Sequence, residues 1–196
     1  MFTWNDKIYL GNALKIIEEF PDDIFDCIVT DPPYESLRKW EGIGTTARMG
    51  LGQKGTNADN PDKFFPTINN SELIQILEQI YRVLKPNCHA YVMCDGDTLP
   101  VFYTIMGKMQ CAPACINSDD INIPFSNIKI LIWDKQNLGM GYHFRCKYEF
   151  IVMLDKGKNR RLNNLSIPDI LSFKPDRPKL VPTQKSVELF KILISQ

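Results

Sequence analysis

The sequence predicts an α/β fold with a mostly parallel sheet, helices on both faces and an antiparallel pair of strands at one edge. Two observations lead to this prediction. Short apolar runs alternate along the chain with stretches of helical periodicity, which is the pattern of parallel α/β sheets. The last two apolar runs have no helical stretch between them, as expected of an antiparallel pair. The 196 residues, 44% of them hydrophobic, suit one domain over 1–196.

The helices are predicted from apolar residues that recur every three or four positions, and the strands from short continuous apolar runs. Pro21 ends the first helix, and Pro86 ends the second. Asn69 and Glu72 have the spacing of a helix-capping pair. In chain order the expected elements are a strand at 7–10, a helix at 13–20, a strand at 25–30 that is buried on both faces, a helix at 73–84, a strand at 89–94, a helix at 99–109, strands at 128–133 and 148–154, and a helix at 186–194.

The charges cancel overall but are unevenly distributed. The chain has 23 basic and 23 acidic residues. Residues 156–185 hold eight basic and two acidic residues, so this segment carries +6 and the remainder carries −6. A local basic patch on an acidic body suits contact with phosphates. A solvated basic loop is the alternative.

Cysteine usage and hydropathy indicate a protein of the cytoplasm. Most of the six cysteines lie in apolar runs, which is typical of buried reduced thiols. Cys111 and Cys115 have no second Cys or His pair nearby, so no metal site is expected. No apolar run reaches the length of a membrane span, and the N-terminus lacks the pattern of a signal peptide.

The segment Asp31-Pro32-Pro33-Tyr34 follows the strand expected at 25–30, at the end where ligands bind in open α/β sheets. Proline fixes the backbone and has no N–H donor, so the carbonyls here and the Asp31 carboxylate are expected to accept hydrogen bonds from an amino group. Two such acceptors favour the pyramidal, nucleophilic form of an exocyclic amine on adenine or cytosine. Tyr34 would stack on a base that has left the duplex. A strand-ending turn without chemistry is the alternative.

Five segments, in order, resemble the amino-group DNA methyltransferases, which transfer methyl from S-adenosylmethionine to adenine N6 or cytosine N4. They are residues 8–14, 26–34, 81–87, 132–151 and 181–189. The third resembles the family's R-x-L-K-P-G-G pattern, with Asn87 and Cys88 in place of the two glycines. The fifth resembles its H-P-T-Q-K-P pattern, with Val181 in place of His and Ser186 in place of the last Pro. The catalytic motif precedes P-T-Q-K, which resembles the circularly permuted β-type arrangement. The resemblance implies a Rossmann-like methyltransferase fold, S-adenosylmethionine as cofactor and double-stranded DNA as partner.

The resemblance also implies roles for individual residues. Asp31 and the Pro32 carbonyl would accept the amine hydrogens, with Pro33 and Tyr34 completing the catalytic motif. Asp31 would also contact the cofactor, together with the turn Pro182-Thr183-Gln184-Lys185 at the cofactor's amino-acid end. Asp rather than Ser at the first position of the motif favours adenine N6 over cytosine N4.

Basic residues in three segments are expected to contact DNA. A glycine-rich loop over 35–67 would close over DNA beside the catalytic motif. Residues 156–180 fall where β-type enzymes carry their target-recognition region. They are too few to recognise more than a minimal part of a base sequence. The expected contacts are Arg38, Lys39, Arg48 and Lys54 in the loop, His143 and Arg145 before the last strand, and Lys158, Arg160 and Arg161 in the basic segment.

One family motif is missing: no F-x-G-x-G cofactor loop occurs before Gln196. In the permuted arrangement the missing segment supplies two central strands, so the strands at 7–10 and 25–30 are expected to expose free edges. Three explanations stay open: a truncated chain, a second polypeptide that supplies the strands (a homodimer or a complementing chain), or a non-catalytic DNA-binding remnant. Methylation of RNA or of a protein amide is a further alternative.

Overall fold

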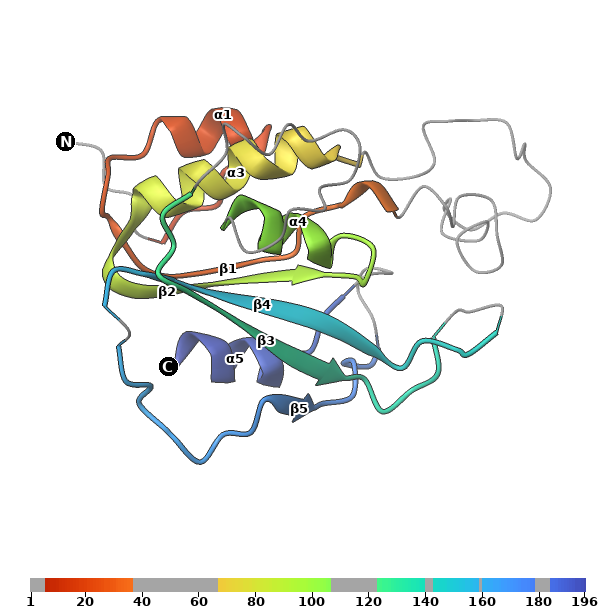
Figure 1. Ribbon diagram of the computed structural model, residues 1–196. Coiled ribbons are helices and arrows are strands. Elements are labelled where there is room, and N and C mark those ends of the chain that lie inside the picture. Colours follow the sequence, from red (N-terminus) through yellow and green to blue (C-terminus); the bar gives the residue numbers. More distant parts are fainter. Residues whose placement is uncertain (1–5, 37–66, 107–122, 140–142, 159, 179–183) are drawn as a thin grey trace, which may run out of the picture.

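A computed structural model gives the structure of the chain. It describes residues 6–36, 67–106, 123–139, 143–158, 160–178 and 184–196. The described part is a five-stranded sheet between two helical layers, with α1, α3 and α4 over one face and α5 over the other (Figure 1). The helices are α1 Ala13–Glu18, α3 Asn70–Val83, α4 Leu99–Ile105 and α5 Val187–Ile194. The strands are β1 Phe25–Thr30, β2 Leu84–Cys94, β3 Asn127–Asp134, β4 Tyr148–Lys156 and β5 Ile170–Ser172.

The strands lie in the order β1-β2-β4-β3-β5. β1 pairs in parallel with β2, and β3 pairs in parallel with β5, whereas β4 is antiparallel to both of its neighbours. Four strands therefore end at the same edge of the sheet, and β4 begins there. We call it the carboxyl edge; it runs past Thr30, Cys94, Asp134, Tyr148 and Ser172.

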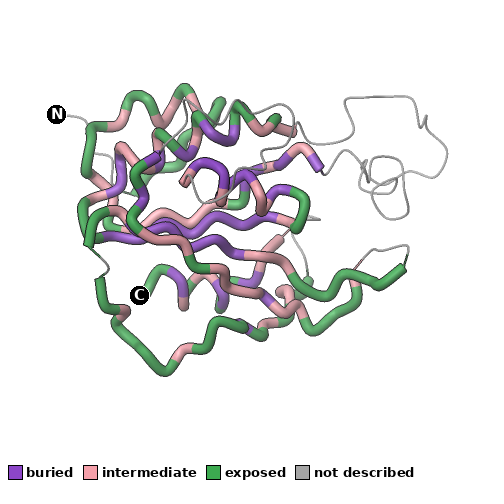
Figure 2. Tube along the Cα trace, in the orientation of Figure 1, coloured by how far each residue is buried: buried purple, intermediate pink, exposed green. Residues whose placement is uncertain are grey.

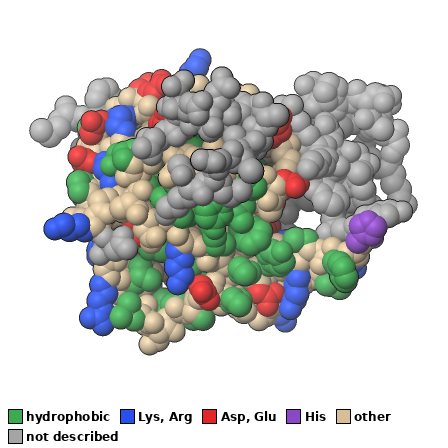
Figure 3. Space-filling model, in the orientation of Figure 1, with side chains coloured by type: hydrophobic (Ala, Val, Ile, Leu, Met, Phe, Trp, Pro, Cys, Tyr) green, Lys and Arg blue, Asp and Glu red, His purple; other side chains and the backbone are tan. Residues whose placement is uncertain are grey.

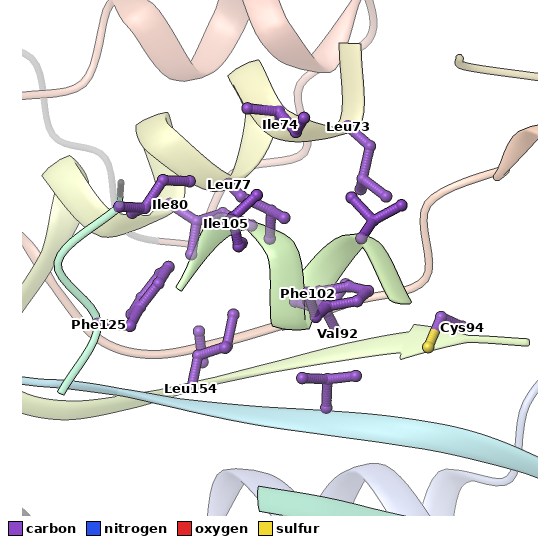
Figure 4. Close-up of a cluster of buried hydrophobic side chains, with 14 of the residues drawn as sticks. Leu73, Ile74, Leu77, Ile80, Val92, Cys94, Phe102, Ile105, Phe125 and Leu154 are labelled. Carbon is purple, nitrogen blue, oxygen red and sulfur yellow. The ribbon is translucent and has the colours of Figure 1, made fainter. Parts of the chain in front are cut away.

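Two apolar cores hold the layers together, one on each face of the sheet (Figure 2). The α3–α4 core contains Leu77 and Phe102, which are fully buried against Val92 of β2 (Figure 4). The α5 core contains Leu189, packed with Met93 of the same strand. Because successive side chains of a strand point to opposite faces, β2 supplies both cores and is almost entirely buried.

The sheet and all four expected helices are present, and the strand over 25–30 has the expected bounds. The expected strand at 7–10 is wrong: this segment is not in the sheet, and Ile8 and Leu10 are fully exposed. Within the described residues β1 is an edge strand, so the expectation of a free edge is confirmed for β1. Its side chains pack against the cores on both faces, as expected, but they are only partly buried.

The antiparallel pair is also not at an edge. β5 adds to β3 from outside, so β3 and β4 lie within the described sheet. β2 begins at Leu84, directly after α3, so Pro86 lies in a strand and not at a helix end. In the described part of the chain, no helix has the length and apolar character needed to cross a membrane.

Candidate active site

Asp31 comes directly after β1 and so lies at the carboxyl edge. Its side chain is 29% exposed, and its Oδ2 lies 3.1 Å from Nζ of Lys185. Burial raises the pKa of Asp31 above its usual range, and the nearby Lys185 charge offsets only part of this rise. Among the described residues, Oδ1 has no hydrogen bond or ion pair. Asp31 therefore presents one free acceptor atom on a partly desolvated carboxyl.

The two prolines place their carbonyls differently. The Tyr34 amide donates to the Pro32 carbonyl at 2.9 Å, and the Ile68 amide donates to the Pro33 carbonyl at 2.8 Å. The second of these bonds belongs to a parallel bridge between Tyr34 and Ile68. A carbonyl oxygen has two lone pairs, so the Pro32 carbonyl keeps one for a ligand. The expectation of outward-pointing acceptors is wrong for Pro33, whose carbonyl holds the chain to Ile68.

Tyr34 is 8% exposed and belongs to the α3–α4 core. Burial raises the pKa of its hydroxyl far above the usual range, with the carboxylates of Glu149, Asp95 and Asp31 adding to the rise. The hydroxyl therefore stays protonated. Since most of the side chain packs against protein, the stacking of a base on this ring stays a prediction.

A chain of charges joins β1, β3, β4 and the segment before α5. The ammonium of Lys185 donates to Oε2 of Glu149 at 2.6 Å, in addition to its contact with Asp31. Lys135 donates to the other oxygen of Glu149, Oε1, at 3.2 Å. Lys185 also lies over the Trp133 ring, 5.7 Å from its centroid. Two lysines and two carboxylates thus meet at the carboxyl edge.

These contacts favour the charged forms of Glu149 and Lys185, although both side chains are mostly buried. Burial alone would raise the pKa of Glu149, but Lys185 and Lys135 together lower it. Burial alone would lower the pKa of Lys185, but Glu149 and Asp31 together raise it. Lys185 was expected to hold the carboxylate of a cofactor. In the structure its charge is already paired with two carboxylates of the protein itself.

Sequence reasoning missed Glu149, Lys135 and Asp95. Asp95 follows β2 at the carboxyl edge, where Ser36 donates to its Oδ2 at 2.5 Å and the Thr98 amide donates to its Oδ1 at 2.9 Å. It thereby ties the turn after Tyr34 to the start of α4. The sequence did contain a sign of both acidic residues, because Glu149 and Asp95 each stand at one end of an apolar strand.

The predicted DNA contacts fall into groups that the structure separates. His143 and Arg145 are exposed and lie in the β3–β4 connection, at the carboxyl edge. Lys158, Arg160 and Arg161 are exposed too, but they follow β4, which runs away from that edge. They lie at the opposite edge of the sheet from Asp31, so the structure does not bring them to the candidate site. The cause is the antiparallel direction of β4.

The basic segment also contributes less free charge than its composition suggests. Lys156 donates to Asp23 at 2.7 Å and lies over the Tyr81 ring, and its side chain is only 12% exposed. Gln184 lies in the described part of the chain, directly before Lys185. The remaining predicted site residues lie outside the described residues: Arg38, Lys39, Arg48, Lys54, Pro182 and Thr183.

Comparison with known proteins agrees with this arrangement. A family model described as DNA methylase matches residues 25–193. The Type II methyltransferase M.HhaII from Haemophilus parahaemolyticus is 25% identical over 188 residues, which are 93% of this chain and 72% of M.HhaII.

Two solved structures share the fold. TTHA0409 from Thermus thermophilus superimposes with a TM-score of 0.51 at 16% identity, covering 94% of this chain and 72% of TTHA0409. The cytosine-N4-specific PvuII DNA methyltransferase superimposes with a TM-score of 0.53 at 12% identity, covering 87% of this chain and 58% of that enzyme.

Proposed function

Because the chain belongs to the DNA methylase family of amino-group methyltransferases, we propose that it transfers a methyl group from S-adenosylmethionine to N6 of an adenine flipped out of double-stranded DNA. The observation that carries the proposal is the position of Asp31 beside the Pro32 carbonyl at the carboxyl edge. Ligands of open α/β sheets bind at this edge. The position suits a small planar substrate that offers two N–H donors.

Asp31 and Pro32 would orient the amine. Oδ1 of Asp31 and the remaining lone pair of the Pro32 carbonyl each accept one amine hydrogen. Both acceptors favour the pyramidal amine and so direct its lone pair away from the protein. Positioning and electrostatics of this kind can supply most of a rate enhancement without a covalent intermediate.

Lys185 and Glu149 would set the charge of Asp31. An ionised carboxylate accepts hydrogen bonds more strongly than a carboxylic acid. Burial favours the acid form of Asp31, and the Lys185 ammonium at 3.1 Å favours the ionised form. Glu149 holds that ammonium in place from the opposite side. The lysine therefore supports the acceptor role of Asp31.

The donor set at this edge fits the cofactor of the family. S-adenosylmethionine carries a sulfonium and an ammonium, and when bound it supplies an electrophilic methyl group. Around Tyr34 and Cys94, the three carboxylates Asp31, Asp95 and Glu149 face the two ammonium groups of Lys135 and Lys185. The local excess of negative charge suits a cationic donor. Asp31 is the carboxylate that we assign to its amino-acid end.

The choice of adenine rests on the acidic first residue of the motif. In the amino-group methyltransferases that the sequence resembles, Asp at this position goes with adenine N6, whereas Ser goes with cytosine N4. Asp31 stands at this position here. The Type II relative M.HhaII supports a role in restriction–modification, in which methylation marks the DNA of the host.

A methyl-transfer assay tests the proposal directly. The chain is incubated with tritiated S-adenosylmethionine and unmethylated genomic DNA. The DNA is then digested to nucleosides, and the methylated nucleoside is identified by mass spectrometry. We expect N6-methyladenine and no N4-methylcytosine. Asp31→Ala should abolish transfer and leave the fold intact, and Asp26→Ala, which removes an exposed carboxylate of the same strand, is the matched control.

The outcomes separate the alternatives. N4-methylcytosine would replace adenine by cytosine as the substrate and leave the rest of the proposal in place. Calorimetric binding of S-adenosylmethionine without transfer to DNA would point to another acceptor, such as RNA. Absence of both binding and transfer would exclude catalysis by this chain alone.

A further inference from the structure

The connection between β3 and β4 projects beyond the carboxyl edge (Figure 1). We call its described residues, 136–139 and 143–146, the hairpin tip. Phe144 lies in this tip with 99% of its surface exposed, and Leu138 is 55% exposed. A fully exposed phenylalanine adds nothing to the protein core. Because single exposed apolar side chains are common on protein surfaces, a role for Phe144 has to come from its position and from the charges around it.

The hairpin tip is held in place by backbone contacts. The Lys135 amide donates to the Lys147 carbonyl at 2.9 Å, and the Gly139 amide donates to the Cys146 carbonyl at 2.6 Å. The Arg145 Nε donates to the Gly139 carbonyl at 3.0 Å. A β-carbon on Gly139 would lie 2.6 Å from the Cys146 carbonyl oxygen, so this close approach requires glycine. Phe144 is therefore presented by an ordered support.

The same hairpin is tied to the candidate active site. Lys135, at its base, contacts Glu149, which holds Lys185, and Lys185 contacts Asp31. Three short contacts thus connect the support of Phe144 with the carboxylate proposed to bind the target amine. A partner held by the hairpin tip would lie at the edge where Asp31 acts.

The charges around the hairpin tip suit a polyanion. Arg145 is exposed beside Phe144, and Lys147 follows with 53% of its side chain exposed and its ammonium 3.4 Å from Asp134. Lys174 and Arg177 are exposed after β5, which ends at the same edge. Figure 3 shows hydrophobic surface and a histidine together at the end that projects to the right. An aromatic side chain among cations is the combination found where proteins stack on bases and contact phosphates.

We propose that Phe144 inserts into the base stack of duplex DNA and occupies the space vacated by the flipped target base. This inference rests on the proposed function, because only an enzyme that extrudes a base creates such a space. Extrusion costs the stacking of the target base with its neighbours. Stacking of the Phe144 ring on those neighbours offsets part of that cost, and Arg145 on the adjacent phosphate fixes the depth of insertion.

An abasic duplex tests the proposal without knowledge of the recognition sequence. The probe is a 30-base-pair duplex with one central abasic site, and the reference is the same duplex intact. Fluorescence anisotropy at low salt gives the ratio of the two affinities for the full chain. The variants are Phe144→Ala, Phe144→Trp and Ile194→Ala. Ile194→Ala is a matched control, because Ile194 is an exposed apolar residue too, with 61% of its surface exposed. It lies at the C-terminal end of α5, away from the carboxyl edge (Figure 1).

We expect the wild type to bind the abasic duplex at least about fivefold more tightly than the intact one, the lower end of what aromatic stacking on a base contributes. Phe144→Ala should lose this preference, whereas Phe144→Trp and Ile194→Ala should keep it. Two results would overturn the proposal: no preference in the wild type, or the same preference in Phe144→Ala. A change of oligomeric state in Phe144→Ala with an unaltered preference would make Phe144 a protein contact instead.

The test is independent of methyl transfer. If the chain prefers the abasic duplex but transfers no methyl group, the proposed catalysis fails and the insertion of Phe144 stands. If it methylates adenine and Phe144→Ala keeps the abasic preference, the insertion fails and the catalysis stands. Because Phe144 is fully exposed, its substitution should leave the thermal unfolding midpoint unchanged, which circular dichroism checks.

Discussion

The ammonium of Lys185 lies between two carboxylates, 3.1 Å from Oδ2 of Asp31 and 2.6 Å from Oε2 of Glu149. The shorter contact is with Glu149, which also binds Lys135. Asp31 therefore shares its only cation among the described residues. The shared ammonium offsets part of the rise that burial causes in the pKa of Asp31, and it contacts only one oxygen of this carboxyl group.

Lys185→Met should move the acid limb of the activity profile to higher pH. Burial already raises the pKa of Asp31, and Lys185 is the main group that lowers it. Without the lysine the pKa rises further, so a higher pH is needed to ionise the carboxylate that accepts the amine hydrogens. Two measurements apply, kcat/KM against pH and the carboxyl ¹³C shift of Asp31. Lys191→Met, an exposed lysine of α5 paired with Glu188, should change neither. An identical Asp31 titration in wild type and Lys185→Met would refute the coupling.

Glu149→Gln should destabilise the fold at neutral pH by about 1–3 kcal/mol, below the usual cost of breaking a fully buried pair because these side chains are 16–20% exposed. The pKa of Glu149 is lowered in the folded state from 4.5. Its stabilisation is therefore complete above pH 4.5 and is lost as the pH falls through the lower, folded-state pKa.

Urea unfolding of wild type and Glu149→Gln at pH 7 and at pH 3.5 measures this difference. The difference in the free energy of unfolding between wild type and Glu149→Gln should be smaller at pH 3.5 than at pH 7. Glu188→Gln removes an ion pair whose partners are more than 60% exposed, and it should leave the free energy of unfolding nearly unchanged at either pH. A gap that widens on acidification would contradict the assigned shift.

The sequence predicted the contiguous part of the site and missed the part assembled across the sheet. Asp31, Pro32 and Tyr34 are neighbours in one motif, so a single strand end places them together. Glu149 reaches them only because β4 runs antiparallel and starts where β1 ends. The sequence predicted that β4 is antiparallel to β3, but it did not predict that β4 lies next to β2, one strand away from β1.

The direction of β4 also explains why three of the expected DNA contacts lie away from the candidate site. Lys158, Arg160 and Arg161 follow a strand that ends at the opposite edge from Asp31. The strand β5 was missed because it has three residues, too few for a periodic signal. The run at 7–10 is apolar enough for a strand, but the described residues offer it no neighbouring strand to pair with.

Asp155→Ala should destabilise the fold by about 2–4 kcal/mol. Oδ1 of Asp155 lies 2.7 Å from Nδ1 of His89, and its Oδ2 accepts from Asn127 at 3.1 Å. Both members of the His89–Asp155 pair are about 5% exposed, and the other ring nitrogen of His89, Nε2, has no hydrogen-bond partner among the described residues. Removing the carboxylate would leave the buried Nδ1 of His89 and the partly buried amide of Asn127 without this partner.

Urea unfolding measures the Asp155 effect, and the exposed Asp169 provides its control. Asp169 lies 4.0 Å from Lys129, and both side chains are more than half exposed. Asp169→Ala should therefore cost less than about 1 kcal/mol. An equal decrease in the free energy of unfolding in Asp155→Ala and Asp169→Ala would show that the buried pair stabilises the fold no more than a surface ion pair does.

Asn69→Ala should weaken both α3 and the support of Tyr34. Asn69 Oδ1 accepts from the Glu72 amide at 2.9 Å, and the Glu72 carboxylate accepts from the Asn69 amide at 2.8 Å. Loss of such a cap costs about 1 kcal/mol. Ile68, the residue before the cap, donates to the Pro33 carbonyl and forms the bridge to Tyr34, so fraying of α3 should loosen that bond.

Hydrogen exchange distinguishes the two consequences of Asn69→Ala. The Ile68 amide should exchange faster in the variant, since its bond to Pro33 depends on where α3 begins. Gln75→Ala, at an exposed position in the middle of the same helix, should leave the Ile68 amide and the stability nearly unchanged. If Asn69→Ala lowered stability but left Ile68 exchange as in the wild type, the cap would serve α3 alone, and Tyr34 would be held by its apolar contacts.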